Sequence, residues 1–195
     1  DLKTLKANTS LVFVAGHSLG GVTGQDYTNG NSAGIKGLIL LGSYMQMKYE
    51  DPQVNFPVPV LTLSGELDGL SKLARLAISF NQMLRHPEQK GHLRYPVAIV
   101  PGATHSSFIN GSVPGPVKNS DLKPEISNQE AWKTFARIIN AFIDVQLNSS
   151  ARKSSEKVLS DYVYGVSFPL VQPLLQAMTL EGNPHLSNQS IVGNT

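Results

Sequence analysis

The residues with the clearest chemical potential are the pentapeptide Gly-His-Ser-Leu-Gly at positions 16–20, which follows the apolar run Leu11–Ala15. A G-x-S-x-G pattern between a buried strand and a helix places its serine, here Ser18, on a sharp turn that exposes the hydroxyl. We expect the turn to require glycine at positions 16 and 20, because so tight a turn leaves no room for side chains on either side of Ser18. The N-terminus of the following helix offers backbone N–H groups where negative charge develops. The pattern therefore predicts a nucleophilic serine; the alternative is a turn serine without a catalytic role.

The partners that a nucleophilic serine needs, a base and an acid that orients the base, follow later in the chain. Asp68 lies in a loop after the apolar run Val60–Ser64, and His105 lies in a loop after the apolar run Tyr95–Val100. An acid just past the end of a strand is well placed to meet a histidine from the next loop.

Alternating strands and helices must position these residues. Near-continuous apolar runs predict four strands that are buried on both faces, at Leu11–Gly16, Ile35–Leu41, from about Val60, and at Tyr95–Val100. Helices are predicted from Ser18 to about Tyr27, over Ser71–Leu84, and from the capping-box pattern Ser127-Asn128-Gln129-Glu130 onward. This alternation predicts the α/β class with a parallel sheet.

The serine, the acid and the histidine, in this order and each past a predicted strand, resemble the catalytic triad of the α/β-hydrolase superfamily. The resemblance extends from about Leu11 to Leu147. Its closest form is the small, cap-less group of lipases, esterases and dienelactone-hydrolase-like enzymes, which includes chlorophyllase-like proteins. The resemblance implies an α/β-hydrolase fold with a partial parallel sheet of about four strands, flanked by helices.

The resemblance also assigns the steps of a hydrolysis. Ser18 would attack the carbonyl of a small-molecule ester or a lipid-like substrate while His105 removes its proton and Asp68 orients the imidazole. The backbone N–H of Leu19 would bind the oxyanion, and water would release the acid from the acyl-enzyme. No cofactor is implied. Thioesters and amides are cleaved by the same arrangement, so the class of scissile bond stays open.

Two of these assignments have competitors in the sequence. Glu66 lies in the same loop as Asp68, but in the families that this chain resembles the residue before the last glycine of that loop usually serves as the acid. Asp68 is also suited to cap a helix that begins at Leu70, which does not exclude the acid role. Three other histidines are poor candidates for the base, because they lie at a helix end (His86), in a turn (His92) and in the polar tail (His185). His17 is next to the nucleophile, but we expect it to pack or to form a hydrogen bond and to point elsewhere.

The interval from about Gly42 to Pro59, between the second and third strands, is too short for the lid that larger relatives insert there. We therefore expect no cap domain and an open site. Tyr44 and Met45 follow directly after the second strand and are candidate substrate-binding residues, since a flexible Met suits varied apolar groups. Ordinary loop packing is the alternative for both.

The strand that leads to Ser18 follows only ten residues, whereas in the superfamily about four strands and the loop with the second oxyanion donor precede it. We therefore expect residues 1–147 to be the C-terminal portion of an α/β-hydrolase domain, and the full enzyme to have a further N-terminal half of ~80–150 residues. Residues 148–195 form a linker and tail outside the resemblance. Within them, 151–157 indicates a charged linker, and 158–180, broken by two prolines, indicates at best a short, kinked helix.

Composition excludes several classes of protein. The 195 residues include no Cys and carry a formal net charge of +2 from scattered Lys and Arg. The sequence therefore predicts no nucleic-acid surface, no metal site and, without an 18-residue apolar run, no transmembrane segment. It does not indicate a cellular compartment. Two hypotheses stand beside the esterase: a non-catalytic hydrolase-like module that binds a ligand or partner, and an incomplete half-domain that associates with a separate N-terminal half.

Overall fold

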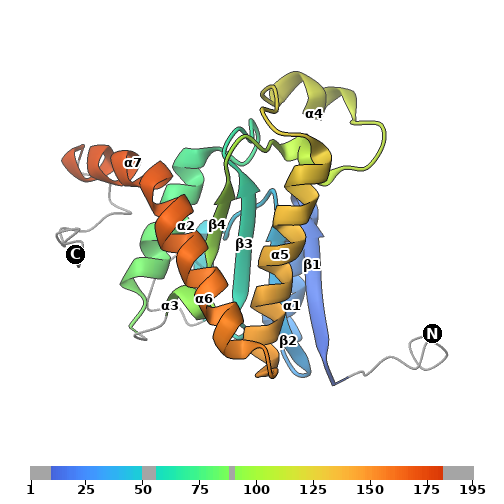
Figure 1. Cartoon of the computed structure of the whole chain (residues 1–195), viewed down its shortest axis with the longest axis vertical. Helices are drawn as coiled ribbons and strands as arrows, with labels where there is room; N and C mark the ends of the chain where they lie inside the picture. The colour runs from blue at the N-terminus through green and yellow to red at the C-terminus, as the bar shows by residue number, and fades with distance from the viewer. Residues whose placement is uncertain (1–9, 50–55, 88–90, 182–195) are drawn as a thin grey trace.

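Four parallel strands form the centre of the protein in a computed structural model, which describes residues 10–49, 56–87 and 91–181. The strands are β1 (Val12–His17), β2 (Ile35–Leu41), β3 (Val60–Gly65) and β4 (Val97–Val100), and they lie in the order β1-β2-β3-β4. Because every strand is parallel to its neighbour, all carboxyl ends lie at one edge of the sheet (Figure 1). The predicted α/β class and four-stranded parallel sheet are confirmed.

Helices cover both faces of this sheet. They are α1 (Leu19–Gly30), α2 (Leu73–Arg85), α3 (Gly91–Arg94), α4 (Gly115–Ser120), α5 (Asn128–Leu147), α6 (Arg152–Tyr162) and α7 (Phe168–Leu180), with the short helical turns η1 (Met47–Tyr49), η2 (His105–Phe108) and η3 (Val163–Ser167). In Figure 1, α5 crosses in front of the strands. The opposite face carries α1 and α2, which pack on side chains of β2 and β4.

The strand sequences follow from this double burial. Successive side chains of a strand point to opposite faces, so β2 directs Ile39 toward α5 and directs Leu38 and Leu40 to the other core. Both sets are buried, which explains why the strand is a continuous apolar run rather than an alternating one.

The predicted start of α5 is confirmed in detail. The Ser127 hydroxyl accepts the Glu130 N–H at 3.2 Å, and the Glu130 carboxylate accepts the Ser127 N–H at 2.9 Å. These reciprocal bonds satisfy two donors at the helix N-terminus. The helix then buries Phe135, Ile138 and Phe142 against the sheet.

Two predicted boundaries shift by two residues for local reasons. The fourth strand begins at Val97 rather than at Tyr95, because the Tyr95 N–H donates to Gly91 and ends α3. The second helix begins at Leu73 rather than at Ser71, because Ser71 is held in the preceding turn by hydrogen bonds described below.

The tail differs most from the prediction. Residues 152–180 are helical throughout, without the expected charged linker over 151–157 and without a break at either proline. A π-helical turn at Val163–Ser167 shifts the apolar stripe along the helix, so a search for a regular 3.6-residue period misses it. The tail packs on α2 and β4, and the Ser167 hydroxyl accepts the N–H of Ile99 in the edge strand β4 at 2.9 Å. Residues 1–9 and 182–195, which include His185, lie outside the described residues.

The segment between β2 and β3 is short, as predicted. Its described residues, 42–49 and 56–59, form loop and the single turn η1, and residues 50–55 lie outside the description. None of the helices in the described ranges combines the length and apolar character needed to cross a bilayer.

Candidate active site

The turn that carries Ser18 joins the end of β1 to the start of α1. Ser18 has φ 56° and ψ −125°, a conformation that a residue with a side chain rarely adopts, and such strain is concentrated at functional sites. Its N–H donates to Leu41 at 2.9 Å, which ties the turn to the end of β2. The sequence therefore positions the serine at the carboxyl edge of the sheet.

The glycines around this turn differ from the prediction in one respect. A Cβ on Gly16 would lie 2.2 Å from the Gly20 carbonyl oxygen, so the strand can approach the helix only at a glycine. A Cβ on Gly21 would lie 2.5 Å from the Ser43 hydroxyl oxygen. A Cβ on Gly20 would meet nothing within 4 Å, so the expectation that Gly20 is required by space is wrong. The close contacts are at Gly16 and Gly21.

Asp68 and His105 form a buried pair at the ends of β3 and β4. His105 Nδ1 lies 2.9 Å from Asp68 Oδ2, and the side chains are 1% and 0% exposed. The Ser64 hydroxyl donates to the same carboxylate oxygen at 3.1 Å. The other oxygen, Oδ1, accepts the backbone N–H groups of Leu70 at 2.9 Å and Ser71 at 2.6 Å. One carboxylate therefore both holds its own loop and binds the imidazole.

These contacts show which of the two acids in this loop, Asp68 or Glu66, lies against His105. Asp68 does bind the turn after it, but α2 begins only at Leu73, so Asp68 is not that helix's N-cap. Glu66 points to another turn, where its Oε2 accepts the Gly102 N–H at 3.2 Å. Asp68, and not Glu66, is the acid hydrogen-bonded to His105.

His105 Nε2, the ring nitrogen opposite the Asp68 contact, is buried and has no hydrogen-bond partner within the described residues. In the neutral tautomer whose Nδ1–H donates to Asp68, this nitrogen carries a free lone pair. Ser18 lies at the same edge of the sheet but does not hydrogen-bond to Nε2. Hydrogen bonds between catalytic side chains are often long or poorly aligned without substrate and shorten when substrate binds.

Gly42 leaves room for the Asp68–His105 pair. It directly follows β2 with φ 50°, and a Cβ there would lie 3.0 Å from His105 Nδ1 and 3.3 Å from Asp68 Oδ2. The Ser71 hydroxyl donates to the Gly42 carbonyl at 2.6 Å, which connects this turn to the acid loop. The ends of β2, β3 and β4 are therefore joined around the imidazole.

His17 packs on the imidazole of His105, a contact that sequence reasoning missed. The two ring centroids are 4.6 Å apart, and His17 also contacts Phe108, which stacks on Phe135 of α5 at 4.1 Å. Burial lowers the pKa of His17 below its usual 6.5, and the neighbouring His105 lowers it further. A neutral ring therefore supports His105. The predicted packing role is present, but His17 faces the histidine loop.

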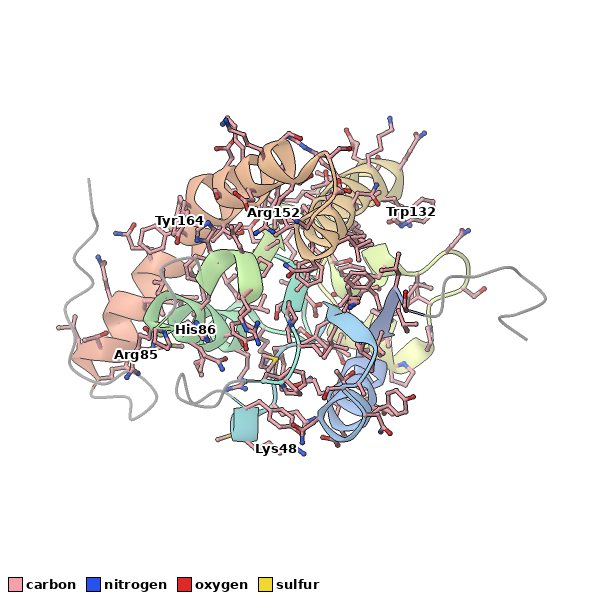
Figure 2. All side chains as sticks on the ribbon, turned by 90° about the horizontal axis from the view of Figure 1, so that it is seen from below. Lys48, Arg85, His86, Trp132, Arg152 and Tyr164 are labelled. Atoms are coloured by element: carbon pink, nitrogen blue, oxygen red, sulfur yellow. The ribbon has the colours of Figure 1, made fainter. Side chains whose placement is uncertain are left out.

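Other histidines lie away from this edge. His86 follows α2, which runs back from the end of β3 toward the amino ends of the strands, and its ring packs on Tyr95 just before β4. Figure 2 shows His86 in the view from below. His92 Nε2 lies 2.9 Å from the Ser160 hydroxyl and its ring contacts Tyr164.

The remaining predicted residues have definite positions. Leu19 is the first residue of α1, so its backbone N–H has no acceptor within the helix, and its side chain is 80% exposed. Met45 is buried in the core beside β2 and β3. The Tyr44 ring lies 4.6 Å from the Arg75 guanidinium. These contacts are ordinary loop packing, and a substrate-binding role for Tyr44 and Met45 stays a prediction.

Among the described residues, no three His, Asp or Glu side chains are grouped so that they could hold a metal ion. Residues 3–132, more than half of the chain, match the model of a family described as the alpha/beta hydrolase family. The matched region contains Ser18, Asp68 and His105. A search of curated proteins and a search of solved structures each found no match.

Proposed function

This chain belongs to the α/β-hydrolase family, and we propose that it is a serine hydrolase that cleaves carboxylic esters of small molecules or lipid-like compounds. Ser18 is the proposed nucleophile, His105 the base and Asp68 the orienting acid. The Leu19 N–H is the proposed oxyanion donor. The specific subgroup of small, cap-less esterases and lipases is part of this proposal.

The observation that carries the proposal is the buried His105 with one ring nitrogen bound and the other unsatisfied. Buried polar groups are nearly always hydrogen-bonded, because an unpaired one costs about 1–3 kcal/mol. Nε2 of His17 is also buried without a partner among the described residues, but of these two histidines only His105 is hydrogen-bonded to a carboxylate through its other ring nitrogen. His105 keeps Nε2 free at the edge of the sheet where Ser18 sits in a strained turn. This arrangement supports the assignment of His105 as the general base that accepts the Ser18 proton.

The proposed reaction proceeds in two halves. In the first, Ser18 Oγ attacks the carbonyl carbon while His105 Nε2 takes its proton and then passes it to the leaving alcohol. Asp68 keeps the Nδ1 proton in place and stabilises the imidazolium that forms. In the second, His105 deprotonates a water molecule that attacks the acyl-enzyme and releases the acid.

The oxyanion is stabilised at the start of α1. Because Leu19 is the first residue of α1, its free N–H and the positive end of the helix dipole support this assignment. One such donor is typically worth on the order of 10²–10³ in rate.

The experiment is steady-state hydrolysis of short-chain p-nitrophenyl esters by the wild-type chain, Ser18→Ala and Ser154→Ala. Ser154 is exposed on α6, so its variant controls for the loss of a hydroxyl elsewhere. We expect kcat of Ser18→Ala to fall by on the order of 10⁶-fold and kcat of Ser154→Ala to match wild type. Folded wild-type protein without turnover, or Ser18→Ala with full turnover, would contradict the proposal. A thioester and an anilide with the same acyl group then rank the classes of bond.

A further inference from the structure

Asp121 is an acidic residue that the proposed mechanism does not use, yet its carboxylate contacts both loops of the Asp68–His105 pair. Oδ1 accepts the backbone N–H of Gly69, next to the acid, at 3.1 Å and that of His105 itself at 3.2 Å. Oδ2 accepts the N–H of Ser106 at 2.7 Å. Oδ1 also accepts the N–H of Leu122 at 3.2 Å.

The backbone around Asp121 is fitted to the acid loop as well. A Cβ on Gly69 would lie 1.9 Å from the Ser120 carbonyl oxygen and 2.9 Å from Asp121 Cα, so this approach requires a glycine at position 69. The backbone contact and the side-chain hydrogen bond to the Gly69 N–H therefore both hold the Asp121 segment against the acid loop.

Little apolar burial holds the segment that carries Asp121. The short helix α4, which precedes it, has no buried residue. A hollow of about 430 Å³ lies beside these contacts, with a lining that includes Thr104, Ser106, Lys118 and Asp121 itself. With so little apolar packing, the polar contacts of Asp121 are a direct link between this segment and the two loops, beside the Glu125 N–H that donates to the Gly102 carbonyl at 2.9 Å.

The charge state of Asp121 suits this role. Burial raises its pKa, but hydrogen bonds from the Ser106 hydroxyl and from the backbone of Ser106, Gly69 and His105 outweigh that effect, and its pKa stays below the ordinary value of 3.8. At neutral pH the group is a carboxylate, which can accept all of these bonds at once.

We propose that Asp121 is a positioning residue that fixes the His105 loop relative to the Asp68 loop by accepting backbone N–H groups from both. The role rests on the proposed function, because it concerns the same pair. Loss of the bridge lets the imidazole move relative to Asp68 and Ser18, and a displacement of about 1 Å in a catalytic group can cost 10²-fold in rate.

The test is Asp121→Asn, compared with Asp26→Asn as a matched control. Asp26 is an exposed carboxylate that also accepts several hydrogen bonds, from Gln46, Lys48 and Tyr49, away from the site. An amide at position 121 directs its oxygen to the Oδ1 position, where Gly69 and His105 donate, and its NH₂ group against the Ser106 N–H, so it loses that bond to the His105 loop and the negative charge that strengthens the others. We expect kcat for the ester to fall about 10- to 100-fold with KM within twofold, and Asp26→Asn to match wild type.

A second measurement separates this inference from the hydrolase proposal. The His105 Nδ1 proton in its hydrogen bond to Asp68 is expected to give a downfield proton resonance, which Asp68→Asn removes. This resonance depends on the pair and not on turnover, so it tests the inference even if the chain hydrolyses no ester. We expect the resonance to broaden or exchange faster in Asp121→Asn.

An unchanged resonance and unchanged kcat in folded Asp121→Asn would overturn the inference. If Asp121→Asn does not fold, Asp121→Glu, which keeps the charge and moves the carboxylate by one methylene, is measured in the same way. Broadening of the resonance in that folded variant supports the inference, and an unchanged resonance with unchanged kcat overturns it.

Discussion

Replacement of Asp68 by Asn tests how the acid controls the imidazole. Asp68 Oδ1 faces two backbone donors, the N–H groups of Leu70 at 2.9 Å and Ser71 at 2.6 Å. An amide NH₂ cannot face these donors, so the amide oxygen of the variant must take the Oδ1 position. The NH₂ group then takes the Oδ2 position, 2.9 Å from His105 Nδ1.

This orientation forces the wrong tautomer on His105. Its Nδ1 must now accept a hydrogen bond from the amide, so the ring proton moves to Nε2, which can no longer take the proton of Ser18. An Asp-to-Asn change in a Ser-His-Asp triad typically lowers kcat about 10⁴-fold, which corresponds to roughly 5 kcal/mol of activation free energy. The Ser64 hydroxyl, which now donates at 3.1 Å, can rotate to accept, so we expect the variant to fold.

The assay is kcat for a p-nitrophenyl ester, with the thermal midpoint of unfolding measured in parallel. Glu66→Gln is the control, because Glu66 is the other acid of the same loop and its carboxylate accepts the Gly102 N–H rather than binding His105. We expect its kcat to stay within about threefold of wild type, since surface changes away from the site have small effects. Asp68→Asn with kcat within tenfold of wild type, or a large loss in Glu66→Gln alone, would refute the reasoning.

Three further predictions concern the fold and its pH dependence. Gly16→Ala lowers the free energy of unfolding by about 1–3 kcal/mol, because its Cβ clashes with the Gly20 carbonyl. Gly20→Ala leaves the free energy of unfolding unchanged or raises it by up to about 1 kcal/mol, because a Cβ there meets no atom within 4 Å. Urea titration of the two variants compares these effects. Ser167→Ala leaves the buried Ile99 N–H without its acceptor and costs about 1–3 kcal/mol, with ester turnover unchanged. Burial makes the pKa of His17 lower in the fold than in the unfolded chain, which therefore binds the proton first, so stability falls as pH drops below 6.5. Thermal midpoints of His17→Phe should therefore decline less than those of wild type between about pH 7 and 5.5.

The strands and the order of the site residues could be predicted because their signals are local. β2 matches its predicted bounds at both ends, since a strand buried on both faces is a continuous apolar run. The start of α5 is likewise determined by four consecutive residues, the capping box from Ser127 to Glu130. The Asp68–His105 contact follows from parallel strands, which bring the loops after β3 and β4 to one edge.

Features that depend on packing between distant segments could not be predicted in this way. The tail packs on β4 and accepts the Ile99 N–H with the Ser167 hydroxyl, and its apolar stripe is offset by a π-helical turn. Asp121 lies in a loop with no periodic pattern, and its partners are backbone groups that any residue type could supply. The contact of His17 with His105 needs the path of η2, which the sequence of the loop does not specify.

The central claim, that Ser18 is an activated nucleophile, is tested most directly by reaction with a fluorophosphonate probe followed by peptide mapping of the labelled residue. We predict one label per chain, on the peptide that contains Ser18, with no label in Ser18→Ala and much slower labelling in His105→Ala. Labelling of Ser154→Ala should equal that of wild type. A folded wild-type chain that takes no label, or a label that persists in Ser18→Ala, would contradict the account.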